Sequence, residues 1–187
     1  MSDFSSLEDQ IRECFGRVVY THKTHEKMAE LCSSKLTYYK IGQIVASALT
    51  TSGILVVVLA AQPPVYIKIA TALLSVATLC LSGYMKGFDP GGTAQKHRDA
   101  AASLWPIRES YLSLLTELRL GSVDLPAVLE RRDALQAELA AVYKGAPQTS
   151  GKAYGLAQTA LKKNEEYTFS DAEIDAFVPI SLRKSKP

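Results

Sequence analysis

"IGQIVASALTTSGILVVVLAAQPPVYIKIATALLSVATLCLSGYM", residues 41–85, decides the fold, because it holds one charged residue, Lys68, in 45 positions. It divides into two apolar runs, 41–61 and 65–85. Each run is long enough, as a helix rising about 1.5 Å per residue, to span roughly 30 Å of bilayer hydrocarbon. We therefore predict two transmembrane helices rather than two buried helices of a soluble protein.

The short link Gln62-Pro63-Pro64 joins the two runs. Proline lacks an amide donor and restricts the residue before it, so the first helix should end here. Proline is tolerated in the first turn of the helix that follows. Lys68 lies one turn into the second run, from which its ammonium group can reach the membrane surface. The link is therefore the corner of a tight membrane hairpin.

Positive charge and tyrosine mark the edges of this hairpin. The basic residues nearest to it on the side of the chain ends are Lys23, Lys27, Lys35, Lys40, Lys86, Lys96 and Arg98. Cytoplasmic flanks carry an excess of Lys and Arg, so both termini are expected in the cytoplasm. Amphipathic rings near the expected membrane surfaces fit this placement, namely Tyr38, Tyr39, Tyr66 and Tyr84.

The region before the hairpin, residues 1–40, carries an apolar stripe whose steps alternate between four and three residues. Its members are Leu7, Ile11, Phe15, Val18, His22, His25, Ala29, Cys32, Leu36 and Tyr39. This spacing predicts one cytoplasmic helix that continues into the first span. It also approaches a heptad seam, which offers a means of pairing copies of the chain.

The region after the hairpin, residues 86–187, is expected to be cytoplasmic and helical. "KGFDPGG", residues 86–92, is a break, and helices are expected over about 93–120, 125–144 and 151–166. Asp124 and Ser150 are candidate N-caps, and Ser170 with Glu173 has the spacing of a capping box that starts a last short helix. No strand pattern appears, so the predicted class is an all-α membrane protein.

Polar side chains recur along one face of each predicted span. They are Gln43, Ser47 and Thr50 in the first span and Thr71, Ser75, Thr78 and Ser82 in the second. Such a stripe either lines a water-filled pathway or packs small residues between helices, as Gly53 and Gly83 also suggest. The pattern alone favours packing. One hairpin cannot surround a channel, so a pore requires a homo-oligomer of four or more copies.

Other chemistry has little support in the sequence. The three cysteines, Cys14, Cys32 and Cys80, show no metal spacing, and His22 with His25 lacks a third ligand. No glycine-rich phosphate loop or nucleophile elbow is present. We expect no enzyme activity, no metal and no cofactor.

Several stretches together resemble a known family. They are the hairpin and "KHRDAAASLWPIRESYLSLLTEL", "ERRDALQAEL", "APQTSGKAYGLAQTAL" and "EIDAFVP". Over roughly residues 17–183 the chain is similar to the SLATT family, two-transmembrane effectors of prokaryotic conflict systems. The resemblance implies a pore-forming effector of the bacterial inner membrane in antiphage defence. It also implies control by a nucleotide signal from a partner nucleotidyltransferase, which in Hailong-type systems is a DNA oligomer that holds the channel shut.

If such a signal binds this chain, cytoplasmic basic residues are the candidates, because they would neutralise phosphates. They are Lys96, Arg98, Arg108, Arg131 and Arg132, with Arg119, Lys152, Lys162 and Lys163 in addition. Lys96 and Arg98 are the preferred pair because they lie nearest to the membrane. The alternative is that these charges are solvated or meet anionic lipid.

Three functions remain open from the sequence. The first is an oligomeric channel, which the resemblance favours. The second is a membrane-anchored helical scaffold whose hairpin only tethers it. The third is a holin-like toxin that disrupts the bilayer without a defined pore.

Overall fold

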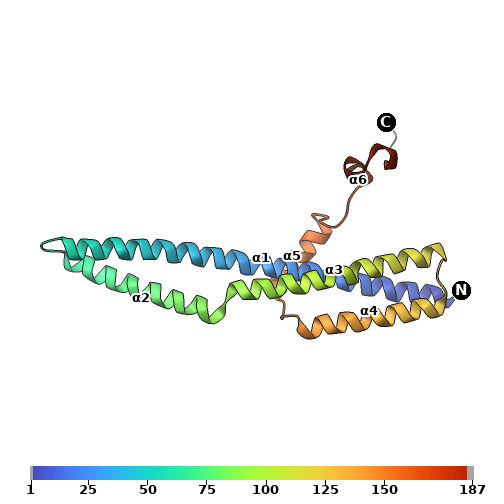
Figure 1. The fold of residues 1–187 in the computed structure, drawn as a ribbon, viewed down its shortest axis with the longest axis horizontal. Helices are drawn as coiled ribbons and strands as arrows, with labels where there is room; N and C mark the ends of the chain where they lie inside the picture. The colour runs from blue at the N-terminus through green and yellow to red at the C-terminus, as the bar shows by residue number, and fades with distance from the viewer. Residues whose placement is uncertain (1, 185–187) are drawn as a thin grey trace.

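The computed structural model describes residues 2–184, and over that range it contains helices and loops but no strand, which confirms the all-α prediction (Figure 1). The helices are α1 (Ser2–Leu59), α2 (Val65–Phe88), α3 (Pro90–Leu120), α4 (Leu125–Gly145), α5 (Gly151–Lys162) and α6 (Asp171–Phe177), followed by a 3₁₀ turn, η1 (Ile180–Leu182).

The long axis of the molecule is α1, which runs without a break from the N-terminal arm into the hairpin, as the stripe predicted. In Figure 1, α2 lies beside the C-terminal half of α1, and α3 lies beside its N-terminal half. α4 packs against α3, and α5 against α1. The chain therefore forms a two-helix membrane hairpin at one end and a thicker helical arm at the other.

The hairpin leaves its apolar side chains uncovered by protein. Ile44, Val58, Leu73 and Leu79 are each between 66 and 72% exposed. No residue is buried inside the protein in the most apolar stretch of either hairpin helix. Exposed apolar surface of this extent is unstable in water but is covered by lipid in a bilayer. The structure thus supports two helices that could cross a membrane, as predicted from their length.

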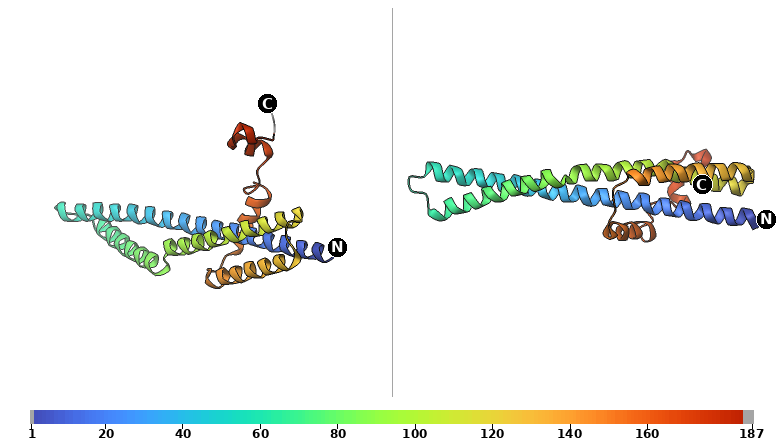
Figure 2. Two further views of the ribbon diagram at one scale, coloured as in Figure 1. Left: turned by 45° about the vertical axis from the view of Figure 1, so that its right-hand side comes forward. Right: turned by 90° about the horizontal axis from the view of Figure 1, so that it is seen from below.

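A single residue, Asp89, separates α2 from α3. Its φ of 36° is left-handed and ends α2, while its carboxylate accepts a hydrogen bond of 2.9 Å from the amide of Gly92 and caps α3. A β-carbon at position 92 would collide with this carboxylate, so the cap depends on glycine there. The predicted break over residues 86–92 is therefore one residue wide, and Figure 2 shows the two helices meeting at this corner.

The core of the arm is built from α1, α3 and α4. Its fully buried members include Ile11, Val18, Leu104, Leu114 and Val128. The predicted stripe on α1 is thus covered by α3 of the same chain. The buried part of this seam, which includes Ile11 and Val18, is therefore not free to pair separate copies in this structure, and the pairing of copies stays a prediction.

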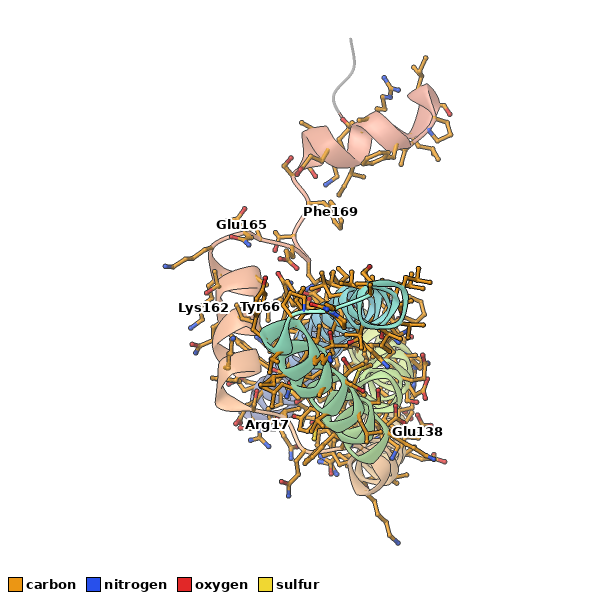
Figure 3. The ribbon with its side chains drawn as sticks, turned by 90° about the vertical axis from the view of Figure 1, so that its left-hand side faces the viewer. Arg17, Tyr66, Glu138, Lys162, Glu165 and Phe169 are labelled. Carbon is orange, nitrogen blue, oxygen red and sulfur yellow. The ribbon has the colours of Figure 1, made fainter. Side chains whose placement is uncertain are left out.

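The last helices begin where their caps predict. Asp124, Ser150 and Ser170 each accept a hydrogen bond from a backbone amide in the first turn, and Ser170 with Glu173 forms the full capping box. α5 ends at Lys162, four residues earlier than expected, because the chain turns at Glu165, whose φ is 51°. Figure 3 shows the chain returning from Glu165 to Phe169, after which α6 projects away from the body.

Candidate functional site

The first candidate region is the inner surface of the hairpin. Gln43 donates a hydrogen bond of 2.9 Å from its side chain to Ser82, across the two helices. Near the corner, a β-carbon at Gly53 would collide with the Thr71 hydroxyl. Glycine at this position therefore allows the two helices to approach closely, as in membrane helix pairs generally.

The seven polar residues predicted to line a pore divide into two groups. Gln43, Thr50, Thr71, Thr78 and Ser82 are partly buried between α1 and α2. Within this group, Thr50, Thr78 and Ser82 each donate a hydrogen bond to the carbonyl four residues earlier. Ser47 and Ser75 are exposed, and neither hydroxyl has a hydrogen-bond partner in the described part of the chain.

The two exposed serines lie on the same edge of the hairpin. Ser47 follows the interface residue Ala46, and Ser75 follows the interface residue Leu74. Both helices are right-handed, and they run antiparallel. The residue that follows an interface residue therefore lies on the same side of the hairpin in α1 and in α2. The register set by the Gln43–Ser82 contact places Ser75 between the levels of Ser47 and Thr51, close to the middle of each span. This serine edge comprises Ser47, Thr51 and Ser75.

The opposite edge of the hairpin is mostly aliphatic. The residues one step before the interface include Val45 and Leu49 on α1 and Leu73 and Ala77 on α2, and all four are exposed. Ser52, one step before Gly53, also lies on this edge, but its hydroxyl donates a hydrogen bond to the carbonyl of Ala48. The two edges of one hairpin therefore differ in polarity at the same depth. A helix pair surrounded by lipid on all sides does not require such a difference.

At the end of the hairpin that adjoins the arm, tyrosines and a lysine form a contact between α1 and α2. The rings of Tyr39 and Tyr84 meet edge to face at 5.4 Å, and Lys35 donates to the Tyr84 hydroxyl at 3.4 Å. Amphipathic rings and lysine prefer this depth of the bilayer.

The second candidate region is a buried polar cluster in the arm, which contains every histidine of the chain. Nδ1 of His25 on α1 lies 2.9 Å from Nδ1 of His97 on α3, with both side chains buried. Burial, together with smaller effects of the neighbouring His97 and His22, lowers the pKa of His25 to about 4. Burial also lowers the pKa of His97. Both imidazoles are therefore neutral at pH 7.

Tyr167, in the loop after α5, completes this cluster. Its hydroxyl donates a hydrogen bond of 2.7 Å to Glu26 and lies 3.3 Å from Nδ1 of His22. Two cations lie close to its ring, with Lys23 4.4 Å and Arg108 4.6 Å from the centroid. Burial and the hydrogen bond to Glu26 raise the pKa of Tyr167, so its hydroxyl stays a donor.

Lys23 carries a buried charge in this cluster and is balanced by two carboxylates. Its ammonium lies 2.8 Å from Glu26 and 2.6 Å from Glu166. Burial opposes the charge, but these hydrogen bonds outweigh it and raise the pKa of Lys23. The ion pairs tie the loop after α5 to α1, because removal of either carboxylate would leave a poorly compensated buried cation.

An open groove of about 710 Å³ begins at this cluster and runs toward the membrane between α1 and α3. Ala101 and Ala102 contribute small side chains to its wall, and Arg98 and Trp105 stand at its rim. Trp105 is 53% exposed, although it is the only tryptophan of the chain. Arg98 donates a hydrogen bond of 3.1 Å to Ser33 across the groove. We call this the Arg98–Trp105 groove.

A family model described as the SMODS and SLOG-associating 2TM effector domain family 4 matches residues 7–173. The chain belongs to this family. This confirms the resemblance to the SLATT family, and it makes the chain a two-transmembrane membrane effector of the kind associated with SMODS and SLOG proteins. No curated protein and no solved structure matches the chain.

In this SLATT effector, the basic residues predicted to bind a signal do not gather at one site. Arg98 contacts Ser33, while Arg132 contacts Gln10, and these two partners lie roughly 35 Å apart along α1. Arg108, Arg131 and Arg132 already pair with Glu109, Glu117 and Asp133 respectively. Lys96 is exposed and has no partner among the described residues, but it faces α4 rather than the Arg98–Trp105 groove.

No sequence pattern predicted the residues that bind the loop to α1, namely Lys23, Glu26, Glu166 and Tyr167. The spacing of Lys23 and Glu26 indicates only a common helical ion pair. A second stripe, on α3, includes His97 and places a third histidine on a buried face, but it does not point to the loop.

Proposed function

We propose that this chain is a pore-forming effector of the bacterial inner membrane in antiphage defence. The pore is an ion channel opened or closed by a nucleotide or oligonucleotide signal from a partner nucleotidyltransferase. Its opening depolarises the membrane, and the infected cell stops growing or dies. The family supports a membrane effector, and the features below support the pore.

The serine edge of the hairpin is the observation that carries this proposal. Ser47 and Ser75 offer unpartnered hydroxyls at mid-membrane depth, on a surface with no protein cover. A hydroxyl facing lipid cannot exchange hydrogen bonds with its surroundings, whereas one facing water can hydrate an ion. Four or more hairpins with their serine edges turned inward enclose such a path, and their aliphatic edges then face the neighbouring hairpin or lipid.

The Arg98–Trp105 groove is where the proposed signal contacts the arm. A guanidinium group binds phosphate through charge-assisted hydrogen bonds, and an exposed indole ring stacks on a base. Among the basic candidates, Arg98 combines a place in this groove with a position near the membrane. A ligand there touches α1 and α3 together, and α1 continues into the first span.

Planar-bilayer recording of the purified protein tests the pore. Wild-type protein should give unitary current steps, and Ser47→Leu with Ser75→Leu should remove them while the oligomer on a native gel is unchanged. Val45→Leu with Ala77→Leu is the matched control on the aliphatic edge and should conduct. Equal conductance of the two double variants contradicts the assignment of the serine edge.

The alternatives give different records in the same experiment. A membrane-anchored scaffold gives no current with wild-type protein. A holin-like toxin gives a leak that grows gradually without unitary steps.

A further inference from the structure

The charged residues of the hairpin all lie on the same side as the serine edge. Residues 36–88 contain three charged side chains, all of them exposed, namely Lys40, Lys68 and Lys86. The residues directly before them, Tyr39, Ile67 and Met85, are partly buried at the contact between α1 and α2. Each lysine therefore follows an interface residue, as the exposed serines do, and projects to the same side of the hairpin.

The three lysines lie at the two ends of this side. In the register set by the Gln43–Ser82 contact, Lys40 on α1 and Lys86 on α2 share one level, where the hairpin adjoins the arm. Lys68 lies in the first turn of α2, at the corner end. Positive charge thus stands at each end of the span, and the serine edge lies midway between.

Tyrosines occupy the same two levels on the opposite, mostly aliphatic edge. Tyr38 and Tyr66 each precede an interface residue, and they are 76 and 72% exposed. Exposed tyrosine rings are typical of a surface that meets lipid at the membrane interface. Contact with lipid on every side would not sort lysines onto one edge and these tyrosines onto the other. The sorting favours lipid at the tyrosine side and water at the lysine side.

No acidic residue balances the three lysines. Residues 31–88 contain no Asp or Glu, and none of the three ammonium groups has an ion pair or hydrogen bond in the part of the chain that the structure describes. In the arm, by contrast, Lys23 and Lys27 pair with carboxylates. Other side chains on the lysine side of the hairpin, such as Ile44 and Leu79, are uncharged. The fixed charge along this side is therefore entirely positive.

We propose that the pore is selective for small anions such as chloride, and that Lys40, Lys68 and Lys86 determine this preference. In an oligomer of four or more copies, the arm end of the pore carries two lysines from each copy and the corner end carries one. Rings of positive charge concentrate anions at the mouths of a pore and exclude cations. Between the two rings, the hydroxyls of Ser47 and Ser75 donate hydrogen bonds to the anion. This inference rests on the proposed pore and names the ion that it conducts.

The direction of anion flow agrees with the proposed effect on the cell. The interior of a cell is held at a negative potential, which drives anions outward. Their exit removes negative charge from the interior and depolarises the membrane.

Reversal potentials in planar bilayers test the inference. Purified protein is recorded across a gradient of potassium chloride, which gives the ratio of chloride to potassium permeability. We expect the wild type to favour chloride at least about fivefold. The combined variant Lys40→Gln, Lys68→Gln and Lys86→Gln should lose this preference. The ratio does not depend on how many channels insert, so a variant that folds less well still reports it.

Salt concentration gives a second readout that needs no variant. Mobile ions screen fixed charge over about 10 Å at 0.1 M salt but only about 3 Å at 1 M. The preference of the wild type for chloride should therefore weaken at high salt. A preference that is the same at both concentrations contradicts a selectivity set by exposed lysines.

Lys35→Gln is the matched control. Lys35 also lies at the arm end of the hairpin, but it precedes the interface residue Leu36, and its ammonium lies over the rings of Tyr39 and Tyr84. This variant should keep the permeability ratio of the wild type.

The outcomes separate this inference from the pore itself. A wild type that conducts without preferring chloride, or a combined variant that keeps the wild-type ratio, overturns the inference, while the current leaves the pore proposal standing. Absence of current from the wild type contradicts both proposals.

Discussion

Nδ1 of His25 and Nδ1 of His97 lie 2.9 Å apart across the contact between α1 and α3, in the buried centre of the arm. At this distance the two nitrogens share one hydrogen, so one ring donates and the other accepts. A second hydrogen between these two atoms would make both nitrogens donors, and it would add a positive charge where burial disfavours one. The pair therefore joins α1 to α3 only while one of the two Nδ1 atoms carries no hydrogen.

This pair predicts that the arm loses stability in mild acid. The pKa of His25 is lowered to about 4 in the folded chain, so the unfolded chain binds more protons between pH 6.5 and about 4. The contribution of His25 to the free energy of unfolding is therefore fully present above pH 6.5. It falls by up to roughly 3 kcal/mol as the pH decreases through this window. Thermal unfolding of the protein in detergent, between pH 7 and 5, measures the loss.

The matched variant for this prediction is His25→Phe with His97→Leu. It removes both imidazoles, so its melting temperature should change little between pH 7 and 5, although carboxylates still act below that range. An equal pH dependence in the variant and the wild type would assign the effect to other groups, such as His22.

Tyr167→Phe should loosen the loop after α5. The substitution keeps the contacts of the ring with Lys23 and Arg108 but removes the hydrogen bond to Glu26. The loss of one hydrogen bond to a charged group costs about 1.5–3 kcal/mol, which predicts at least about tenfold faster amide exchange in residues 164–169. Hydrogen exchange followed by mass spectrometry measures this. Tyr154→Phe, at an exposed ring on α5, is the control, and the same exchange rate in both variants would argue against the contact.

Gly53→Ala should weaken the hairpin, because a β-carbon there collides with Thr71. Overpacking of this kind costs about 1–3 kcal/mol. Gly42→Ala is the control on the same helix, since a β-carbon at position 42 meets nothing within 4 Å. Thr71→Ala should restore the stability of Gly53→Ala. Denaturation in mixed detergent gives the comparison, and a Gly53→Ala variant as stable as Gly42→Ala would contradict this helix contact.

Trp105 gives a direct test of the proposed signal site, because it is the only tryptophan in the chain. Addition of a short DNA oligomer or a cyclic dinucleotide should change its fluorescence in a saturable manner, and Arg98→Ala should weaken the apparent affinity about tenfold or more. Lys152→Ala, on α5, should leave it unchanged. A fluorescence that responds equally in the wild type and in Arg98→Ala would place the signal elsewhere.

Local features of the chain were predictable from the sequence because they depend on near neighbours. The lack of charge around Lys68 indicated the two spans, and Pro63 and Pro64 indicated the corner. The caps at Asp124, Ser150 and Ser170 fixed the starts of three helices to the residue. These signals need only helix geometry and the thickness of a bilayer.

Features that depend on distant partners were not predictable. The stripe containing Ile11 and Val18 indicated a buried face but not its partner, which is α3 of the same chain. The polar spacing in the spans did not separate Thr78, inside the hairpin, from Ser75, on its edge. The role of Tyr167 depends on Glu26, 141 positions earlier, and no local pattern joins them.

The membrane hairpin with both arms on one side is the central claim, and cysteine labelling in intact cells tests it most directly. In a chain with Cys14, Cys32 and Cys80 changed to Ser, Gln62→Cys marks the corner and Phe177→Cys marks the cytoplasmic end. A membrane-impermeant maleimide added outside should label Gln62→Cys only, and Phe177→Cys should react only after the inner membrane is opened. Labelling of both positions from outside, or of neither until the membrane is opened, would contradict the hairpin.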